Sequence, residues 1–200
     1  MRIIKGEFRN RRILTPKGLS TRPTPEMVRE ALFNILGDFV VEARVLDLFA
    51  GSGGVGLEAL SRGAASAAFV ERDARALAVL KRNIQTFGAR GCAQLVAADA
   101  YRRMNALAGR EFDFIFAAPP YDNLNPGAIL MGIARMRLLA DGGILVIQIP
   151  SSDQAIPEVK GLVLVDERRY GRNQLTFYEK VAESGPENHA DASDESTVSG

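Results

Sequence analysis

One segment constrains the fold of this chain more than any other. An apolar run at 44–49 passes into a glycine-rich turn, and the turn passes into a helical pattern. Gly51 and Gly53 carry no Cβ, so they can adopt positive φ and let the backbone approach a ligand closely. A helix beginning near Val55 would direct free N–H groups and its positive dipole end to the same place. The segment therefore predicts a nucleotide-cofactor site at a strand end.

Two acidic residues bear on which nucleotide cofactor this is. Gly51, Gly53 and Gly56 have the spacing of a dinucleotide-binding turn, and Glu71 follows 20 residues after Gly51. That carboxylate suits two ribose hydroxyls in either a dinucleotide or an S-adenosylmethionine site. Asp47, just before the turn, would face a cationic or amino-bearing ligand better than a pyrophosphate. The residues favour S-adenosylmethionine over NAD, and a turn that only packs a strand on a helix is the structural alternative.

Length and composition limit the other possibilities. The 200 residues suffice for one domain with a small appendage, and 46% of them are hydrophobic, enough for a core. No run approaches the roughly 18 apolar residues of a membrane span, and residues 1–6 lack the apolar stretch of a secretory signal. Cys92 is the single cysteine, which excludes an internal disulfide and a cysteine-rich zinc site. We expect a cytoplasmic protein, a monomer, with no metal and no membrane contact.

Charge is distributed unevenly along the chain. Residues 1–30 hold eight Lys and Arg against three Glu, whereas residues 182–200 hold five acidic residues and no Lys or Arg. A basic arm on a near-neutral body is typical of phosphate-backbone binding, with a solvated charged surface as the alternative. We predict a basic arm at 1–23, a main domain at 24–181 and a disordered acidic tail at 182–200. The candidate RNA-binding residues are Arg2, Lys5, Arg9, Arg11, Arg12 and Arg22.

Strands and helices alternate along the body of the chain. Apolar runs predict strands at 44–49, 66–70, 93–97, 112–117 and 143–149. Helical spacing predicts helices at 25–36, 55–62, 73–87, 100–108 and 126–139. This order indicates an α/β fold with a parallel, doubly wound sheet, whose ligands bind at the carboxyl ends of the strands. Asp47, Glu71, Asp99 and Pro119 all fall at such ends.

Both ends of the chain depart from this alternation. Apolar residues at 3–4 and 12–14 flank a basic stretch and predict a short β-hairpin. Thr24-Pro25 then has the pattern of a helix N-cap followed by a first-turn proline. Near the other end, apolar runs at 162–166 and 174–179 flank a short turn and predict an antiparallel hairpin at the sheet edge. A parallel sheet that ends in an antiparallel strand resembles a class I methyltransferase more than a dinucleotide dehydrogenase.

A stiff loop, Ala118-Pro119-Pro120-Tyr121, follows the strand predicted at 112–117. Two successive prolines fix φ twice and remove two donors, so the loop carbonyls are free to accept hydrogen bonds. Such a loop can hold a planar amino group while Tyr121 stacks on the ring that carries the amino group. A rigid turn that merely ends a strand is the alternative.

Further motifs run through the chain and identify a family. They are Arg2-Ile3-Ile4-x-Gly6, Leu19–Thr24, Val28–Leu36, Asp47–Gly53 and Leu57–Gly63. The Arg-Pro-Thr element joined to the Val-Arg-Glu helix is much more specific than the glycine turn. Over about residues 1–180, the chain resembles the bacterial methyltransferases that modify guanine N2 in small-subunit (16S) ribosomal RNA, the RsmD-like family.

The resemblance implies a fold, a reaction and a cofactor. The fold would be class I and Rossmann-like, with a mostly parallel seven-stranded sheet that ends in an antiparallel hairpin. The reaction would be direct transfer of a methyl group from S-adenosylmethionine to an exocyclic amine, without a covalent enzyme intermediate. By the same resemblance, Asp47, Gly51 and Gly53 would line the methionine part of the cofactor. Glu71 would hold its ribose hydroxyls and Asp99 would meet its adenine amino group.

The resemblance also implies a partner. Ala118, Pro119, Pro120 and Tyr121 would receive a guanine flipped out of the RNA, and the stacking position suits Tyr121. The substrate would be RNA in a nearly assembled small ribosomal subunit, held by the basic arm. Arg22 is the candidate for a phosphate contact near the site.

Ala118 departs from the family pattern, which has Asp, or Asn in relatives, at this position. That side chain accepts a hydrogen bond from the target amine and orients its lone pair toward the methyl group. Losing one preorganised partner costs roughly 2–4 kcal/mol, about two to three decades in rate. The Pro119 carbonyl can still accept one N–H, and Asp122 and Asn123 are further candidates. The alternatives are an adenine-N6 methyltransferase, a non-catalytic RNA-binding or ribosome-assembly protein, and an NAD-dependent oxidoreductase.

Overall fold

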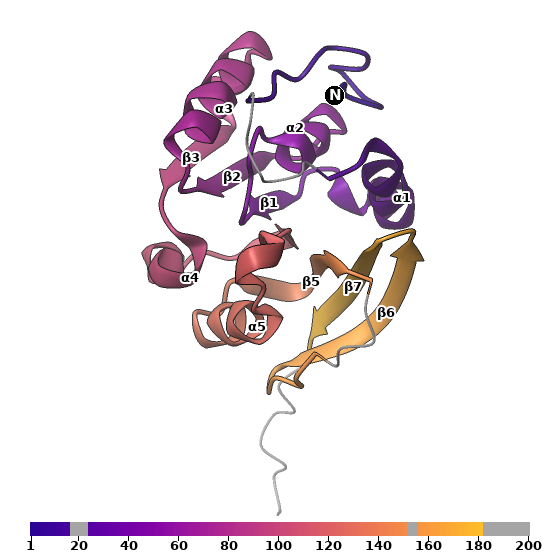
Figure 1. Cartoon of the computed structure of the whole chain (residues 1–200), viewed down its shortest axis with the longest axis vertical. Coiled ribbons are helices and arrows are strands. Elements are labelled where there is room, and N and C mark those ends of the chain that lie inside the picture. The colour runs from indigo at the N-terminus through magenta and orange to yellow at the C-terminus, as the bar shows by residue number, and fades with distance from the viewer. Residues whose placement is uncertain (17–23, 152–155, 182–200) are drawn as a thin grey trace, which may run out of the picture.

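The computed structural model describes residues 1–16, 24–151 and 156–181, and its centre is a seven-stranded sheet. The strands are β1 Arg44–Asp47, β2 Ser66–Glu71, β3 Ala93–Ala97, β4 Phe112–Ala117, β5 Leu139–Pro150, β6 Leu162–Tyr170 and β7 Asn173–Lys180. Their order is β3-β2-β1-β4-β5-β7-β6 (Figure 1). The first five pair in parallel, and β7 lies antiparallel to both β5 and β6. The predicted parallel sheet with a terminal antiparallel hairpin is confirmed.

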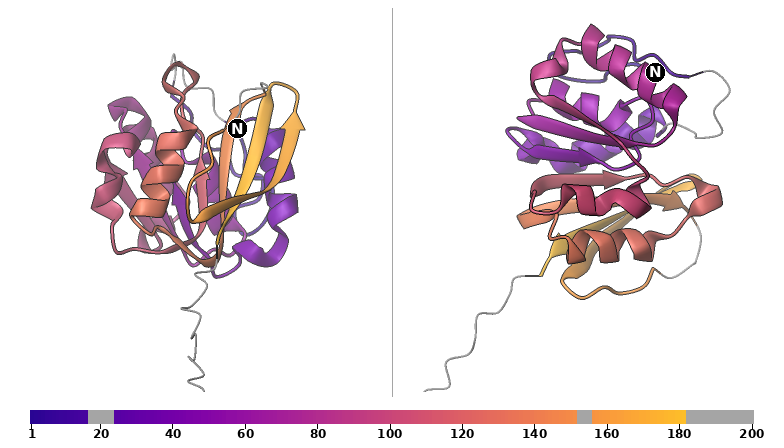
Figure 2. Two further views of the ribbon diagram at one scale, coloured as in Figure 1. Left: turned by 90° about the horizontal axis from the view of Figure 1, so that it is seen from below. Right: turned by 90° about the vertical axis from the view of Figure 1, so that its left-hand side faces the viewer.

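Helices cover both faces of the sheet. The described α-helices are α1 Glu26–Leu36, α2 Gly54–Ser61, α3 Ala74–Thr86, α4 Ala100–Arg103 and α5 Pro126–Arg135. Residues of α1, α2 and α3 share one buried cluster with one face of the sheet, and residues of α4 and α5 share a second cluster with the other face. Figure 2 shows the molecule from two further sides, with the β6–β7 hairpin at the end of the sheet away from α3. None of the described helices is long and apolar enough to cross a membrane.

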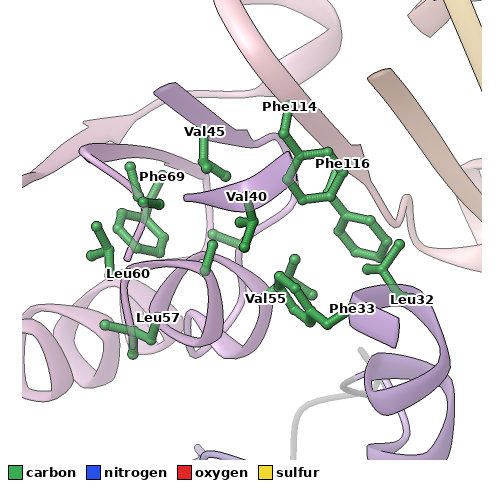
Figure 3. Close-up of a cluster of buried hydrophobic side chains, with 14 of the residues drawn as sticks. Leu32, Phe33, Val40, Val45, Val55, Leu57, Leu60, Phe69, Phe114 and Phe116 are labelled. Atoms are coloured by element: carbon green, nitrogen blue, oxygen red, sulfur yellow. The ribbon is translucent and has the colours of Figure 1, made fainter. Parts of the chain in front are cut away.

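The cluster under α1 and α2 fixes the part of the fold that carries the glycine turn. Leu32 and Phe33 of α1 and Val55 of α2 pack toward Phe114 and Phe116 of β4 (Figure 3). The rings of Phe33 and Phe114 meet edge to face, with centroids 6.4 Å apart. Burying each such side chain contributes roughly 1.5–3 kcal/mol. This shared cluster therefore holds the start of α2 on the sheet.

A glycine lets α2 lie close to the sheet. A Cβ built on Gly56 would stand 2.3 Å from the Phe69 ring of β2, nearer than any real Cβ contact. The third glycine of the turn pattern is thus required by helix–strand packing.

The N-terminal segment packs on the domain as an irregular loop. Arg2 and Arg12 form one antiparallel bridge, and backbone hydrogen bonds from Ile3 to Arg11 and from Ile13 to Met1 flank it, so the two predicted segments do pair, but the pairing is too short to form regular strands. Ile3 and Ile13 are each 1% exposed and belong to the same core cluster as α1 and α2. Packing of these two isoleucines on the domain thus accompanies the short antiparallel pairing.

A buried carboxylate on α2 fastens this loop. Glu58 accepts hydrogen bonds from the backbone N–H groups of Ile4 and Lys5, at 2.8 and 3.0 Å. It also pairs with Arg62 at 2.9 Å and with Arg29 of α1 at 3.5 Å. The Glu58 and Arg29 side chains have no exposed surface. The carboxylate therefore ties three segments of the chain together.

Two helix starts were predicted with different success. The N-cap of α1 is Pro25, because the Thr24 hydroxyl donates to Gln148 at 2.9 Å and caps no helix; the prediction of Thr24 as N-cap is wrong. Asp73 caps α3 as predicted, accepting from the N–H groups of Arg75 and Ala76.

Two predicted helices are shorter than expected. The helix predicted at 100–108 is α4 followed by a 3₁₀ turn at 104–107. The helix predicted at 126–139 ends at Arg135, because Arg137 adopts φ 51° and β5 begins at Leu139. Apolar residues continue the helical spacing past Arg135, so a prediction from periodicity alone places the end of the helix too late in the chain.

Candidate active site

The glycine turn between β1 and α2 has the predicted backbone geometry. Gly51 and Gly53 adopt φ of 54° and 85°, which only glycine takes without strain. Gly53 is the N-cap of α2 and lies behind the turn, where a Cβ would stand 2.5 Å from Leu80 of α3. Around Gly51, by contrast, a Cβ would meet no atom within 4 Å. Gly51 thus faces open space, whereas Gly53 serves packing.

A cavity of about 250 Å³ opens beside this turn, at the carboxyl ends of β1, β2, β3 and β4. The predicted site residues that line it are Asp47, Gly51, Glu71, Asp99, Ala118 and Pro120. Three others, Gly53, Pro119 and Tyr121, lie next to lining residues without lining the cavity themselves. The sheet therefore brings acidic residues from three separate strand ends to one place, as its parallel order requires.

Asp47 places a desolvated carboxylate at the bottom of this cavity. It is 2% exposed, and Oδ2 accepts a hydrogen bond from the Gly56 N–H at 3.1 Å. Burial raises the pKa of Asp47 to about 7, and nearby Glu71 adds to the rise, while the Gly56 hydrogen bond opposes it. A cationic group in the cavity would favour the charged form of Asp47.

Glu71 shapes the glycine turn. Its Oε2 accepts from the Gly51 N–H at 2.8 Å, and its Oε1 accepts from the N–H groups of Arg72 and Asp73, each at 2.8 Å. Two carboxylate oxygens offer about four acceptor sites, so three N–H donors leave capacity for one more donor. Glu71 thus anchors the turn and still presents an acceptor edge to the cavity.

Asp99 and Arg72 form an ion pair on the cavity wall. Arg72 Nη1 lies 2.8 Å from Asp99 Oδ2, and Asp99 also caps α4 by accepting from the N–H groups of Tyr101 and Arg102. Partial burial would raise the pKa of Asp99, but the hydrogen bond and charge of Arg72 and the two N–H donors hold it below its ordinary value. Asp99 is therefore an ionised acceptor.

The proline loop closes the far side of the cavity. Ala118 is partly buried against the core, and Pro119 is buried. Tyr121 begins a 3₁₀ turn, is 52% exposed, and donates its hydroxyl to Asn173 Oδ1 at 3.1 Å. The loop thus presents one half-exposed aromatic ring beside the cavity, and no carboxylate at position 118.

Sequence reasoning missed several lining residues. Met1, Thr15, Pro16 and Thr24 form part of the wall, so the N-terminal segment contributes to the cavity. Thr24 belongs to the motif at 19–24, but its spacing does not show that it faces the cavity, and no local motif marks the other three.

Two aromatic rings on the cavity wall were also missed. Phe49 and Tyr101 contact each other with centroids 5.4 Å apart, and both line the cavity. Phe49 lies within the motif Asp47–Gly53, and Tyr101 follows Asp99 by two residues; these positions are the sequence signal for the pair. The pair offers an apolar surface against which a flat heterocycle can pack.

The predicted RNA-binding residues differ in their surroundings. The Arg11 guanidinium lies over the rings of Phe8 and Phe87 and donates to the Thr86 carbonyl. Arg2 donates to the Asn10 carbonyl at 2.8 Å.

Three other basic side chains make fewer contacts than Arg2 and Arg11. Lys5, Arg9 and Arg12 are exposed and make no side-chain hydrogen bond or ion pair with the described residues. Arg22 lies outside the described residues, as does the acidic tail. In the described ranges, no three His, Cys, Asp or Glu side chains form a group that could hold a metal ion.

The groups that line the cavity suit one kind of ligand. Three carboxylates, one of them buried with no cation from the described part of the chain paired to it, can receive an ammonium group, hydroxyl groups and an amino group. The glycine turn lets a ligand approach the backbone, and the aromatic pair can flank a base. Asp47 and Glu71 at the glycine turn would repel a pyrophosphate, which argues against a dinucleotide. These features fit S-adenosylmethionine.

The sequence is similar to known proteins over most of its length. A family model described as conserved hypothetical protein 95 matches residues 1–179. Bacillus subtilis YlbH, whose name gives it as a provisional rRNA methyltransferase, is 39% identical over 90% of this chain and 99% of its own length. The Escherichia coli K12 protein named ribosomal RNA small subunit methyltransferase D is 42% identical over 60% of each chain.

A solved structure extends the match to the whole fold. The Escherichia coli protein yhhF, named provisionally as a methyltransferase, superposes with a TM-score of 0.82 at 33% identity. The superposition covers 92% of this chain and 99% of that one. The architecture described above is therefore shared over nearly the full length of both chains.

Proposed function

The chain belongs to the RsmD family, whose family model is described as conserved hypothetical protein 95, and from this membership we propose that it is an S-adenosylmethionine-dependent ribosomal RNA methyltransferase. We propose further that its target is the exocyclic N2 of a guanine in small-subunit rRNA. One observation carries the proposal: Asp47, Glu71 and Asp99 converge from three strand ends on a single cavity that continues to the proline loop.

Each carboxylate has a proposed role on one part of the cofactor. Asp47 would receive the ammonium group, because its buried carboxylate gains most from a cation. Glu71 would accept from the ribose through the capacity left after its three N–H contacts. Asp99, held ionised by Arg72, would accept from the adenine amino group. S-adenosylmethionine, when bound, supplies an electrophilic methyl group on a sulfonium centre.

The proline loop would hold the base that accepts the methyl group. A guanine amine is weakly nucleophilic because its lone pair is delocalised into the ring, so its orientation carries much of the rate. The Pro119 carbonyl would accept one N–H of the amine, and the Tyr121 ring would stack on the base. Asp122 also lines the cavity and is the carboxylate that follows the loop most closely in the chain. No residue of this loop needs to form a covalent bond.

Exposed basic residues would hold the RNA. Lys5, Arg9 and Arg12 have side chains free to contact phosphates, and we assign the same role to Arg22. The proposed partner is an assembling small ribosomal subunit whose RNA exposes the target base.

Methyl transfer tests the proposal. Small-subunit particles that lack the modification are incubated with the protein and S-adenosyl-[methyl-³H]methionine, and the labelled nucleoside is identified after digestion. We expect label in N2-methylguanosine, weak for the wild type and strong for Ala118→Asp. Label in N6-methyladenosine would show a different methyltransferase.

Ala118 supports a second candidate, a non-catalytic RNA-binding protein of the same fold. In that case the protein would bind both S-adenosylmethionine and the particle, while neither the wild type nor Ala118→Asp would leave a methyl group on the RNA. Binding without transfer in both forms therefore separates the two candidates.

A further inference from the structure

Four side chains form a polar network that ends on Tyr121 of the proline loop. The Tyr121 hydroxyl donates to Asn173 Oδ1 at 3.1 Å, and Gln148 Nε2 donates to the same oxygen at 3.0 Å. Gln148 Oε1 in turn accepts from the Thr24 hydroxyl at 2.9 Å. The network thus joins the residues just before α1, strand β5, the β6–β7 hairpin and the proline loop.

The inner part of this network is held rigidly. Gln148 belongs to β5 and is 5% exposed, and its strand is paired on both sides, with β4 and β7. Asn173 is the first residue of β7 and pairs with Pro150 and Tyr170. The hairpin turn is further fixed to β5, because the Ser151 N–H donates to the Arg172 carbonyl at 2.9 Å.

Tyr121, at the outer end of the network, is held less firmly than Gln148 and Asn173. Tyr121 starts a 3₁₀ turn of three residues, and no side-chain hydrogen bond caps that turn. About half of the Tyr121 side chain is exposed, so packing restrains the ring only in part. The hydroxyl contact with Asn173 is the hydrogen bond found for this side chain among the described residues.

We propose that Asn173 is a positioning residue that fixes the Tyr121 ring, and that Gln148 and Thr24 fix Asn173. The inference rests on the proposed function, in which Tyr121 stacks on the target base. Tyr121 lies between Pro120 and Asp122, both of which line the cavity, whereas Asn173 and Gln148 do not. Asn173 therefore acts through Tyr121 and touches neither cofactor nor base. A preset ring orientation reduces the ordering that base binding would otherwise require.

A double-mutant cycle tests the contact. Tyr121→Phe removes the hydroxyl and keeps the ring, Asn173→Ala removes the acceptor, and Asn173→Asp keeps an acceptor oxygen for both donors. We expect each of the first two variants to lower kcat about fivefold to tenfold, the scale of one net hydrogen bond. The double variant should fall no further than Asn173→Ala alone, because that substitution already removes the hydrogen bond that Tyr121→Phe removes.

Two readouts separate positioning from a general structural role. The affinity for S-adenosylmethionine should stay within about twofold in all variants, and Asn173→Asp should recover most of kcat. Multiplied losses in the double variant, or weaker cofactor binding in Asn173→Ala, would overturn the proposal.

An activity-independent measurement keeps the inference distinct from the proposed function. The chain has four tyrosines and no tryptophan, so 3-fluorotyrosine labelling gives a simple ¹⁹F spectrum in which Tyr121→Phe assigns one line. In Asn173→Ala we expect that line to narrow as the ring gains mobility, while the other three keep their widths. An unchanged line would overturn the proposal even if methyl transfer is seen. A narrowed line with no transfer in any form would uphold the anchoring contact and reject the proposed function.

Discussion

The carboxylate of Asp47 accepts a hydrogen bond from the backbone N–H of Gly56, at 3.1 Å, and faces the cavity with no cation of the described residues paired to it. Asp47 ends β1, and Gly56 lies in the first turn of α2, so the contact spans the glycine turn. Burial outweighs this single hydrogen bond and raises the pKa of Asp47 to about 7. The free protein is therefore prepared for a positively charged group at this point.

Cofactor binding should depend on pH through Asp47. Below pH 7 the carboxyl group is mostly protonated in the free protein, and an ammonium group favours the ionised form. Binding must then release a proton, so the affinity should fall about tenfold per pH unit below 7 and level off above it. Calorimetric titration with S-adenosylmethionine from pH 5.5 to 7.5, where the ammonium group of the ligand stays mostly charged, measures this. Asp47→Asn should bind more weakly at about pH 7.5 and show a flat profile; a flat wild-type profile would contradict the assignment.

The same shift predicts how stability varies with pH in the free protein. An unfolded Asp ionises near pH 4, whereas folded Asp47 ionises only near pH 7. Between these values the unfolded state binds fewer protons, so the Asp47 contribution to the free energy of unfolding falls as pH rises through this window, by up to about 4 kcal/mol. Urea unfolding at pH 4.5, 6 and 8 should show a smaller decline for Asp47→Asn than for the wild type. Parallel profiles for the two proteins would count against the raised pKa.

Restoring a carboxylate at position 118 should act on turnover alone. Ala118→Asp supplies an acceptor for the target amine and should raise the methyl-transfer rate about 100-fold to 1,000-fold. Ala118→Asn should give a smaller gain, and the affinity for the cofactor should remain within about twofold in both variants. Single-turnover transfer to small-subunit particles measures the rate. Equal rates in the wild type and Ala118→Asp would show that the loop does not act on the base as proposed.

The basic N-terminal residues should divide into two groups. Arg9→Ala and Arg12→Ala should weaken particle binding and reduce the slope of log affinity against log salt by about 1 each. Arg11 is the matched control, because its guanidinium is engaged with Phe8, Phe87 and Thr86. Arg11→Ala should lower the free energy of unfolding by about 1–2 kcal/mol and change the salt slope less. Filter binding at several salt concentrations measures the slope for each variant. Equal changes of slope for Arg9→Ala, Arg12→Ala and Arg11→Ala would refute the assignment of Arg11 to a separate group.

Two acidic residues with ion pairs should differ sharply in their effect on stability. Glu58 is fully buried and holds Arg29, Arg62 and the N-terminal backbone, so Glu58→Gln should cost about 3–5 kcal/mol. Asp113 pairs with Arg44 at 2.9 Å on the surface, and Asp113→Asn should cost less than about 1 kcal/mol. Denaturant unfolding compares them. Similar losses for the two variants would mean that the Glu58 network does not hold the N-terminal segment.

Much of the fold could be predicted from the sequence, because local patterns determine it. The bounds of β3 and β4 agree with their apolar runs, and Asp73 identified the start of α3. The end of α5 could not be predicted, because a positive φ at Arg137 stops a helix whose apolar spacing continues. The N-terminal loop was missed for a different reason. Its partner is Glu58, more than fifty residues away in the chain.

In the candidate site, too, some features follow from sequence patterns and others depend on long-range contacts. Asp47, Glu71 and Asp99 were found because parallel strands end on one edge, a consequence of topology alone. The network behind Tyr121 depends on tertiary contacts between Gln148 and Asn173, which no spacing reveals. One signal was nevertheless present: Gln148 is a lone polar residue in the apolar run of β5. A buried amide in such a strand needs hydrogen-bond partners, so it marks a polar contact even before the partners are known.

Binding of S-adenosylmethionine itself is the most direct test of the central claim. Isothermal titration of the protein at pH 8 with S-adenosylmethionine, and in parallel with NAD, measures which nucleotide the cavity accepts. We expect one S-adenosylmethionine bound per chain, a marked loss of affinity in Asp47→Asn, and no heat of binding with NAD. Binding of NAD, or no binding of S-adenosylmethionine to the wild-type protein, would contradict the central claim.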